Sequence, residues 1–195
     1  MQLKFNNKVD HTKKHFSSVN LLWEVELTGV DLDILYPELL RSDIWETAEF
    51  MGGLRFRNNN KSEIINNFVN EFNSLKTETL EYIYHFDRKT FSERWWKSLE
   101  HYENNTGMHT TIFKDTPGFS MGPHLDNSHI IAQLVLNITN NTTGTEFYET
   151  SKTKPYYKAP LDQYKGVLFF NNATAGHGIQ NVTEDRFILY SGILY

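Results

Sequence analysis

Four residues in the second half of the chain have the types and the spacing of a metal site beside a cation. His124 and Asp126 are separated by one residue, His177 lies on a later segment, and Arg186 follows it. Two neutral imidazoles and one carboxylate are the ligand set that holds a non-heme Fe(II) on one face and leaves its other positions open. The pattern therefore predicts an iron-dependent oxygenase.

The two neighbouring ligands, His124 and Asp126, have a spacing that suits a β-strand. Residues i and i+2 of a strand point to the same side, so both side chains can reach one ion while Leu125 faces away. A lone His-x-Asp is a weak signal in a chain with eight histidines, and its alternative is an ordinary polar pair at the start of a strand. The signal becomes specific only when a distant histidine and a following arginine are added.

His177 must come from a different strand. It stands in the middle of the polar stretch 171–184, and the apolar segments 166–170 and 186–190 on either side of this stretch are typical of strands. Glycines flank the histidine, which suits a close backbone approach to a bound ion or substrate. The alternative is a surface histidine beside glycines, with Arg186 at the solvated edge of a strand.

Beyond these four residues, the chain from 108 to 195 resembles the 2-oxoglutarate and Fe(II)-dependent dioxygenase superfamily, and within it the prolyl-4-hydroxylase-like branch. The resemblance rests on short segments that occur in the family's order: a Pro-Gly turn, the first two ligands, a strand ending in Leu-Asn, a glycine turn before an aromatic residue, and a strand leading to the distal histidine. These segments are Thr-Pro-Gly at 116–118, Pro-His-Leu-Asp-Asn at 123–127, Leu-Val-Leu-Asn at 134–137, Gly-Thr-Glu-Phe-Tyr at 144–148, and Pro160 with Gly-Val-Leu-Phe-Phe at 166–170.

The resemblance implies a role for each of the four residues. His124, Asp126 and His177 would bind Fe(II), and Arg186 would pair with the far carboxylate of 2-oxoglutarate, since a guanidinium offers a carboxylate a planar fork of donors. O2 is then the oxidant, and ascorbate is a further candidate cofactor. The implied reaction is hydroxylation of a peptidyl residue such as proline, or of a small amino-acid-like molecule, with release of succinate and CO2. Halogenating relatives lack the carboxylate, so Asp126 favours hydroxylation.

Two positions depart from the family's pattern around the cosubstrate. Many members carry a hydroxyl residue two positions after the arginine, where this chain has Ile188, and many carry a tyrosine on the strand before the Pro-Gly turn, where this chain has Phe113. The far carboxylate would then need another hydroxyl partner. Tyr148, Thr111 and Tyr190 are the candidates, and the sequence does not select among them.

The N-terminal half has helical rather than alternating spacing. Ser62 can cap a helix whose apolar residues recur at three- and four-residue steps, a second helix is expected over 91–102, and 21–27 is interpreted as a short edge strand. Together with the family's architecture, this predicts a mainly β fold with N-terminal helices (α+β), in which a double-stranded β-helix, or jelly roll, at 108–195 is supported by 1–107. The apolar positions of the first helix are Ile64, Ile65, Phe68, Val69, Phe72 and Leu75.

Length and composition favour a single domain, 1–195. With 39% hydrophobic and 14% aromatic residues, the chain can form one substantial core. No charged-then-apolar N-terminal segment and no apolar run of membrane-spanning length is present, so we expect a cytoplasmic protein without a membrane partner. The absence of cysteine excludes disulfides and thiolate metal sites.

The charge distribution argues against nucleic acid as a partner. The formal net charge is −5 and no element carries a dense basic stripe. Gly192 also stands where nucleic-acid-demethylating relatives commonly carry a second arginine. A peptide or small-molecule substrate is therefore expected, and the oligomeric state stays open. A protein of a different class also fits the pattern: a cupin-like metal- or ligand-binding jelly roll without oxygenase turnover, in which Arg186 serves only structure.

Overall fold

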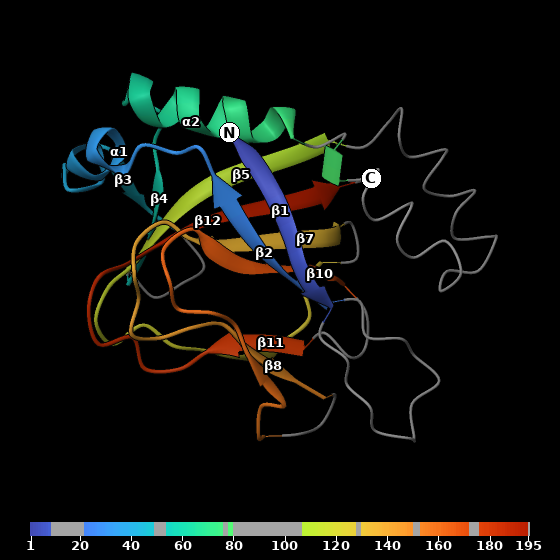
Figure 1. The fold of residues 1–195 in the computed structure, drawn as a ribbon. Coiled ribbons are helices and arrows are strands. Elements are labelled where there is room, and N and C mark those ends of the chain that lie inside the picture. The colour runs from blue at the N-terminus through green and yellow to red at the C-terminus, as the bar shows by residue number, and fades with distance from the viewer. Residues whose placement is uncertain are drawn as a thin grey trace.

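Two antiparallel β-sheets and two longer helices make up the part of the chain that the computed structural model describes. This part comprises residues 1–8, 22–48, 54–75, 78–79, 107–127, 130–149, 153–171 and 176–194. Figure 1 shows the larger sheet above the smaller one, with the helices on the far side of the larger sheet. This arrangement is consistent with the expected jelly roll. The helix predicted over 91–102 lies outside the described residues.

The larger sheet has eight strands, and each strand is antiparallel to its neighbours. In their order across the sheet they are β1 (Gln2–Lys8), β2 (Leu22–Thr28), β10 (Lys165–Phe170), β7 (Ile130–Asn137), β12 (Arg186–Leu194), β5 (Gly107–Asp115), β4 (Arg55–Asn58) and β3 (Trp45–Thr47). The strands predicted over 166–170 and 186–190 are confirmed as β10 and the first part of β12. Strands from before residue 108 therefore form both ends of this sheet.

β2 is an interior strand, so the prediction of an edge strand over 21–27 is wrong. It pairs with β1 on one side and with β10 on the other. Trp23, Val25 and Leu27 are accordingly almost fully buried. The pattern of one strand shows which of its faces is buried but not which strands lie beside it, and the polar strand β1 covers the edge that β2 would otherwise expose.

The smaller sheet has four strands, and it carries the segments that flank the predicted site. In their order across the sheet they are β6 (Met121–His124), β11 (Gly176–Ile179), β8 (Glu146–Tyr148) and β9 (Tyr157–Lys158). All three pairings are antiparallel. His177, expected on a strand of its own, lies on β11 in the middle of this sheet.

Helices α1 (Leu32–Leu39) and α2 (Glu63–Ser74) pack on the outer face of the larger sheet (Figure 1). α2 begins after Ser62, whose Oγ accepts a hydrogen bond from the backbone N–H of Ile65 at 3.3 Å, as its sequence predicts. Phe68 and Phe72 of α2 belong to the main hydrophobic core, together with alternate residues of the central strands. This core fixes the larger sheet as a rigid platform behind the site.

The inner face of the larger sheet turns toward the smaller sheet and carries a second, smaller core. Successive residues of a strand point to opposite faces, so Leu134 and Leu136 of β7 join the helix-side core, whereas Val135 joins the inter-sheet core. The inter-sheet core consists of Leu22, Val135, Phe147, Ala159, Val167, Phe169 and Ile188. It fills part of the space between the sheets and leaves a cavity beside it.

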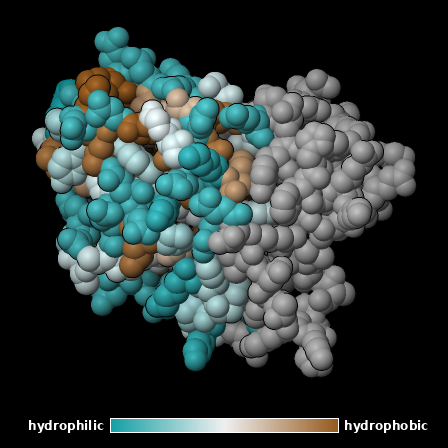
Figure 2. Space-filling model, in the orientation of Figure 1, coloured by the Kyte–Doolittle hydropathy of each residue, from teal (hydrophilic) through white to brown (hydrophobic). Residues whose placement is uncertain are grey.

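The coloured part of the surface in Figure 2 is mostly hydrophilic, and hydrophobic residues appear there in small groups. Among the described residues, Ile34 on α1 and Leu40 just after it are the most exposed large apolar residues, at 55% and 61%. No helix among the described residues has the length and apolar character that crossing a bilayer requires.

Candidate metal centre and its cavity

His124, Asp126 and His177 converge on one point, with their ligand atoms all within 4.8 Å of one another. Nε2 of His124 lies 3.5 Å from Oδ1 of Asp126, and Nε2 of His177 lies 3.4 Å from Oδ2. The two histidines are direct partners in the pairing of β6 with β11, and their ring centroids are 4.5 Å apart. The structure thus brings together the three ligands that the spacing predicts.

Asp126 reaches the histidines from just beyond the end of β6, not from within a strand. β6 ends at His124, and residues 125–127 after it have no regular secondary structure. Leu125 is 49% exposed and is not among the residues that line the cavity. The side-chain amide of Asn171 holds this segment, since its Nδ2 donates to the backbone oxygens of Asp126 at 3.1 Å and of Asn127 at 3.0 Å. The structure brings the two side chains together as the spacing predicts, but the prediction that Asp126 lies on a strand is wrong.

Hydrogen bonds set the protonation of the ligands. Nδ1 of His124 lies 2.9 Å from the backbone oxygen of Gly122, so a protonated Nδ1 can donate there and leave Nε2 for a metal. The hydrogen bond to Asp126 raises the pKa of His124, although burial opposes this. Burial also works against ionisation of Asp126, but hydrogen bonds from both histidines outweigh it and hold the pKa of Asp126 well below its usual range. The carboxylate is therefore ionised near neutral pH, as metal binding requires.

Close packing holds His177 in place. It is 6% exposed, and its ring centroid lies 4.9 Å from that of Phe169 and 6.2 Å from that of Phe147. The next residue, Gly178, is so close to β6 that a Cβ there would be 2.5 Å from the backbone oxygen of Met121. Glycine is needed at this position because the neighbouring atom belongs to the backbone and cannot turn aside.

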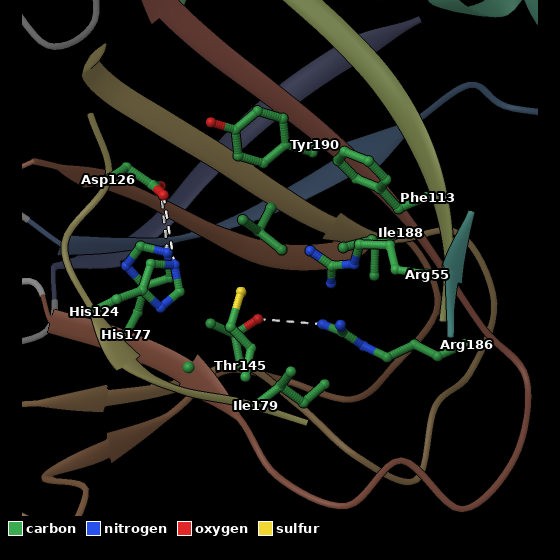
Figure 3. A pocket seen from close by; sticks show the side chains of 13 residues that line it. Arg55, Phe113, His124, Asp126, Thr145, His177, Ile179, Arg186, Ile188 and Tyr190 are labelled. Carbon is green, nitrogen blue, oxygen red and sulfur yellow. Dashed lines mark hydrogen bonds and ion pairs between the residues drawn. The ribbon is translucent and has the colours of Figure 1, made fainter. Parts of the chain in front are cut away.

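A cavity of about 240 Å³ lies beside the three ligands, with residues of both sheets in its walls. Figure 3 shows the metal-ligand side chains at one end of the cavity and two guanidinium groups, those of Arg55 and Arg186, toward the other. Apolar and aromatic side chains line the space between these ends: Phe113, Val135, Ile179, Ile188 and Tyr190. Such a site can hold a molecule that binds metal at one end and carries an anion at the other.

The cationic end of the cavity is one row of side chains across three neighbouring strands. Asp115 on β5 is the register partner of both Arg55 on β4 and Arg186 on β12. Arg55 donates to the Asp115 carboxylate through Nε at 2.5 Å and Nη2 at 2.8 Å, and Arg186 donates to it through Nη1 at 2.9 Å. Asp115 is 0% exposed, Arg186 3% and Arg55 7%. Two buried cations thus share one buried carboxylate.

Arg186 retains hydrogen-bonding capacity after this pairing. Its Nη2 donates to Oγ1 of Thr145 at 3.2 Å, and its Nε has no hydrogen-bond partner among the described residues although it is buried. Burial lowers the pKa of Arg186 to about 10, aided by the nearby charge of Arg55 and opposed by Asp115. The group is still charged at neutral pH. A buried, charged and incompletely paired guanidinium fits the anion-binding role proposed for Arg186.

Of the three hydroxyl candidates, Tyr190 is the one that lines the cavity. Its ring packs against Phe113 with centroids 5.9 Å apart, and burial, together with the charge of Asp126, raises its pKa. Tyr148 instead donates to Glu146 at 2.5 Å, and neither Tyr148 nor Thr111 is among the cavity residues. Thr145, a hydroxyl residue that accepts a hydrogen bond from Arg186, was not among the predicted candidates.

The donor set fits Fe(II). Two imidazole nitrogens and one carboxylate group, with their ligand atoms within 4.8 Å of one another, lie at one end of the cavity, and the sequence contains no cysteine that could add a thiolate. Such a donor set can hold Fe(II) and leave coordination positions open for further ligands. The sequence did not identify Arg55 and Asp115 as residues of the cationic end of the cavity, because no motif near either of them marks a site.

Comparison with known proteins gives matches in structure only, since no protein-family model and no curated protein matches the chain by sequence. A prolyl-4-hydroxylase from Pseudomonas putida is similar with a TM-score of 0.59 and 12% identity, over 90% of this chain and 92% of its own. A viral collagen prolyl hydroxylase from Paramecium Bursaria Chlorella virus-1, in its 2-oxoglutarate complex, gives 0.53 and 10%, over 89% and 95%.

A third solved structure that matches contains a bound peptide fragment. It is a prolyl hydroxylase from Trichoplax adhaerens in complex with a hypoxia inducible factor oxygen degradation domain peptide fragment, with a TM-score of 0.53 and 11% identity, over 84% of this chain and 77% of its own. These identities are low, and the shared property is the arrangement of the strands. The chain therefore has the fold of prolyl-4-hydroxylase-like 2-oxoglutarate and Fe(II) oxygenases.

Proposed function

We propose that the protein is an Fe(II)- and 2-oxoglutarate-dependent dioxygenase that hydroxylates its substrate. The observation that carries the proposal is the pairing of two features in one cavity: a two-histidine, one-carboxylate set at one end and a buried, incompletely paired Arg186 at the other. A 2-oxo acid with a second carboxylate has the two groups that these ends would bind. The shared fold agrees with this function but does not establish it.

Each part of the site has a definite task in this proposal. His124, Asp126 and His177 would hold the iron, and Arg186 would bind the far carboxylate with Thr145 beside it. Bound iron and 2-oxoglutarate would supply the oxidation, in which O2 is consumed, 2-oxoglutarate becomes succinate and CO2, and a substrate C–H bond becomes C–OH. The apolar walls exclude water and fix the orientation of the cosubstrate.

For the substrate, we propose a peptidyl residue such as proline, or a small amino-acid-like molecule. Support comes from the matched prolyl hydroxylase that was solved with a peptide fragment. It also comes from the cavity, whose cationic end would be filled by the cosubstrate, so that the substrate must approach from the metal end. The net charge of −5 makes a polyanionic substrate unfavourable.

The first test is cosubstrate turnover with matched variants. The Fe(II)-loaded protein should convert 2-oxoglutarate to succinate, and His177→Ala and Asp126→Ala should abolish this conversion with unchanged circular dichroism. His109→Ala is the control, because His109 is an exposed histidine on β5 that does not line the cavity. Activity that survives both ligand substitutions would show that the metal assignment is wrong.

A specific observation favours a second candidate, a metal- or ligand-binding jelly roll without turnover. Arg186 already has a carboxylate partner in Asp115, and Ile188 and Phe113 stand where oxygenases commonly carry hydroxyls for the cosubstrate. An anaerobic titration separates the two candidates. The oxygenase should show a weak visible metal-to-ligand charge-transfer band when 2-oxoglutarate is added to the iron protein, whereas the second candidate binds iron without this band.

A further inference from the structure

We propose that Arg55 is a positioning residue that keeps the Arg186 end of the cavity cationic, so that this end selects a dicarboxylate ligand over a monocarboxylate one. The inference rests on the proposed function, because it takes 2-oxoglutarate as the ligand. It adds Arg55 and Asp115, which lie on other strands, to the site. It also attributes the preference for a dicarboxylate to the net charge of Arg55, Asp115 and Arg186 together, in addition to the contact that Arg186 makes.

The charge of this end follows from its three ionic groups. Arg55 and Arg186 contribute two positive charges and Asp115 one negative charge, which leaves one cation uncompensated. Apart from the Tyr190 hydroxyl, the other ionisable groups that line the cavity are the three predicted metal ligands at its opposite end. A buried charge without a partner is costly, so the site gains most from a ligand that brings one more negative charge.

Arg55 is needed because of the way in which Asp115 is shared. Both oxygens of Asp115 accept from Arg55, whereas Arg186 reaches only Oδ2. The planar pairing with Arg55 is the stronger of the two contacts. Without Arg55, the Asp115 carboxylate would pair with Arg186 alone. This pair would carry no net charge and would therefore no longer attract an anion.

Packing prevents Arg55 from leaving this position. Its guanidinium lies over the rings of Phe113, at 4.9 Å from the centroid, and Phe119, at 4.4 Å. Stacking on aromatic faces is favourable for a guanidinium and restricts its motion. Arg55 itself lines the cavity, so its charge acts on a bound ligand at short range and with little screening by solvent.

The test measures ligand affinity in a charge-swap series. The variants are Arg55→Gln, Asp115→Asn and the double variant, and the ligands are 2-oxoglutarate and 2-oxopentanoate, which has the same chain but lacks the far carboxylate. Binding to the anaerobic Fe(II) protein is followed by its charge-transfer band. Arg57→Gln is the matched control, since Arg57 lies two positions along β4, is exposed and pairs with Glu46.

Three results are expected. Arg55→Gln should weaken 2-oxoglutarate binding about tenfold or more, since a charge-assisted contribution is lost, and should leave 2-oxopentanoate binding unchanged. Asp115→Asn should reduce neither affinity. The double variant should recover most of the lost affinity, because it again carries a net single positive charge. Equal weakening for both ligands, or a double variant as weak as Arg55→Gln, would overturn the proposal, since either shows a merely structural role.

A second measurement keeps this inference separate from the proposed function. Glutarate, a dicarboxylate without the 2-oxo group, should raise the thermal unfolding temperature of the metal-free wild-type protein and of Arg57→Gln, but not that of Arg55→Gln. The iron protein could bind no 2-oxoglutarate while glutarate stabilises the wild type but not Arg55→Gln. In that case the proposed function is wrong, and the proposal of a dicarboxylate site is supported. If glutarate has no effect that depends on Arg55, the charge-balance inference is wrong.

Discussion

The side-chain amide of Asn171, the residue after β10, donates a hydrogen bond to the backbone carbonyl oxygen of Asp126 at 3.1 Å. A second bond from the same nitrogen to Asn127, at 3.0 Å, fixes the segment that follows β6. Asp126 lies outside any strand, so this contact with the larger sheet replaces the support that a β-ladder would give. The position of Asp126, one of the three candidate metal ligands, therefore depends on a residue that does not line the cavity.

Replacement of Asn171 by alanine should lower metal affinity by roughly tenfold to a hundredfold, the usual effect of removing a group that orients a ligand. A competition titration against a chromogenic chelator measures this. Asn66→Ala is the control, since Asn66 makes a similar bond to the backbone oxygen of Asn60, at 2.8 Å on α2, remote from the site. Equal metal affinity in the two variants would show that the Asn171 contact does not position Asp126.

The approach of β11 to β6 gives a second prediction, at Gly178. Alanine there places a Cβ at 2.5 Å from the backbone oxygen of Met121, so β6 must shift and take His124 with it. We expect Gly178→Ala to cost about 1–3 kcal/mol of unfolding free energy and to weaken metal binding. Gly122→Ala provides the comparison, because a Cβ at Gly122 meets nothing within 4 Å although the residue lies on the same strand as His124. Chemical denaturation of both variants should separate them clearly.

Glu146 predicts a pH dependence of stability. Burial raises its pKa, but hydrogen bonds from Lys158 and Tyr148 outweigh this, and the pKa is lowered from its ordinary value of 4.5. The folded state therefore binds this proton less readily than the unfolded state. Glu146 stabilises the fold above its unfolded pKa, and this contribution is lost as the pH falls through its lowered folded pKa.

Glu146→Gln should thus unfold more easily than wild type in urea at pH 7, and the difference should shrink as the pH falls below 4.5. Lys158→Met, which keeps the carboxyl group but removes the cation at 2.5 Å, should lose part of the same pH dependence. A stability difference that stays constant between pH 7 and pH 3 would argue against an ionic role for Glu146.

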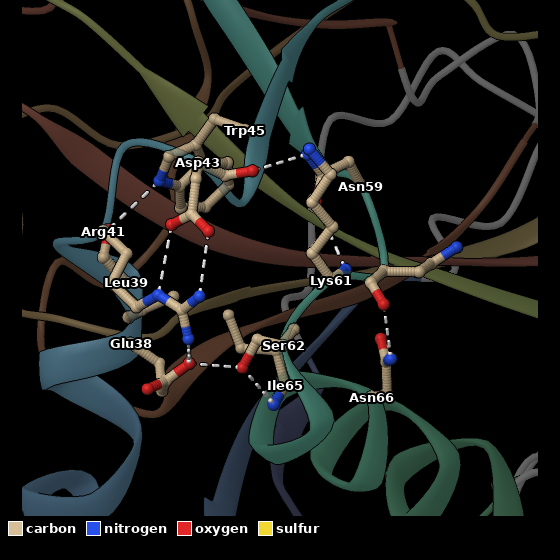
Figure 4. A network of polar contacts seen from close by, with 11 residues as sticks. Glu38, Leu39, Arg41, Asp43, Trp45, Asn59, Lys61, Ser62, Ile65 and Asn66 are labelled. Carbon is tan, nitrogen blue, oxygen red and sulfur yellow. Dashed lines mark hydrogen bonds and ion pairs between the residues drawn. The ribbon is translucent and has the colours of Figure 1, made fainter.

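The cap of α2 also joins the two helices. Figure 4 shows Ser62 between the helices: its Oγ accepts from Ile65 N–H and donates to Glu38 at 2.5 Å, and Arg41 binds the same Glu38 oxygen at 2.8 Å. Ser62→Ala should cost about 1–2 kcal/mol of unfolding free energy, since it removes both a cap and a buried contact. Ser74→Ala, at the exposed end of α2, should change stability much less. Thermal or urea unfolding of the two variants gives the comparison.

The sequence marked His124, Asp126 and His177 as candidate metal ligands because this combination of residue types is rare, and the structure places the three side chains together. His124 and Asp126 are close in the chain, and His177 stands out as a histidine between glycines and strands. Even so, the prediction that Asp126 lies on a strand was wrong, since the spacing alone cannot show that β6 ends at His124. Residue types were enough to predict the set but not its support by Asn171.

The cationic row could not be predicted in the same way. Arg55 and Asp115 are ordinary charged residues in their own segments, and they become partners of Arg186 only through the pairing of β4 and β12 with β5. Strand pairing between distant segments depends on the whole sheet, so the sequence of one segment alone does not predict its partners. The same limit explains why β2 was predicted at an edge. It also explains why Thr145, which contacts Arg186, was not among the hydroxyl candidates.

The two ends of the cavity belong to different sheets, and this has a mechanical consequence. The candidate metal ligands lie on or just beyond β6 and β11, whereas the cationic row lies on β4, β5 and β12. A molecule bound at both ends of the cavity would link the two sheets and oppose their separation. Occupancy should then be visible as slower amide hydrogen exchange in the short strands β6 and β11.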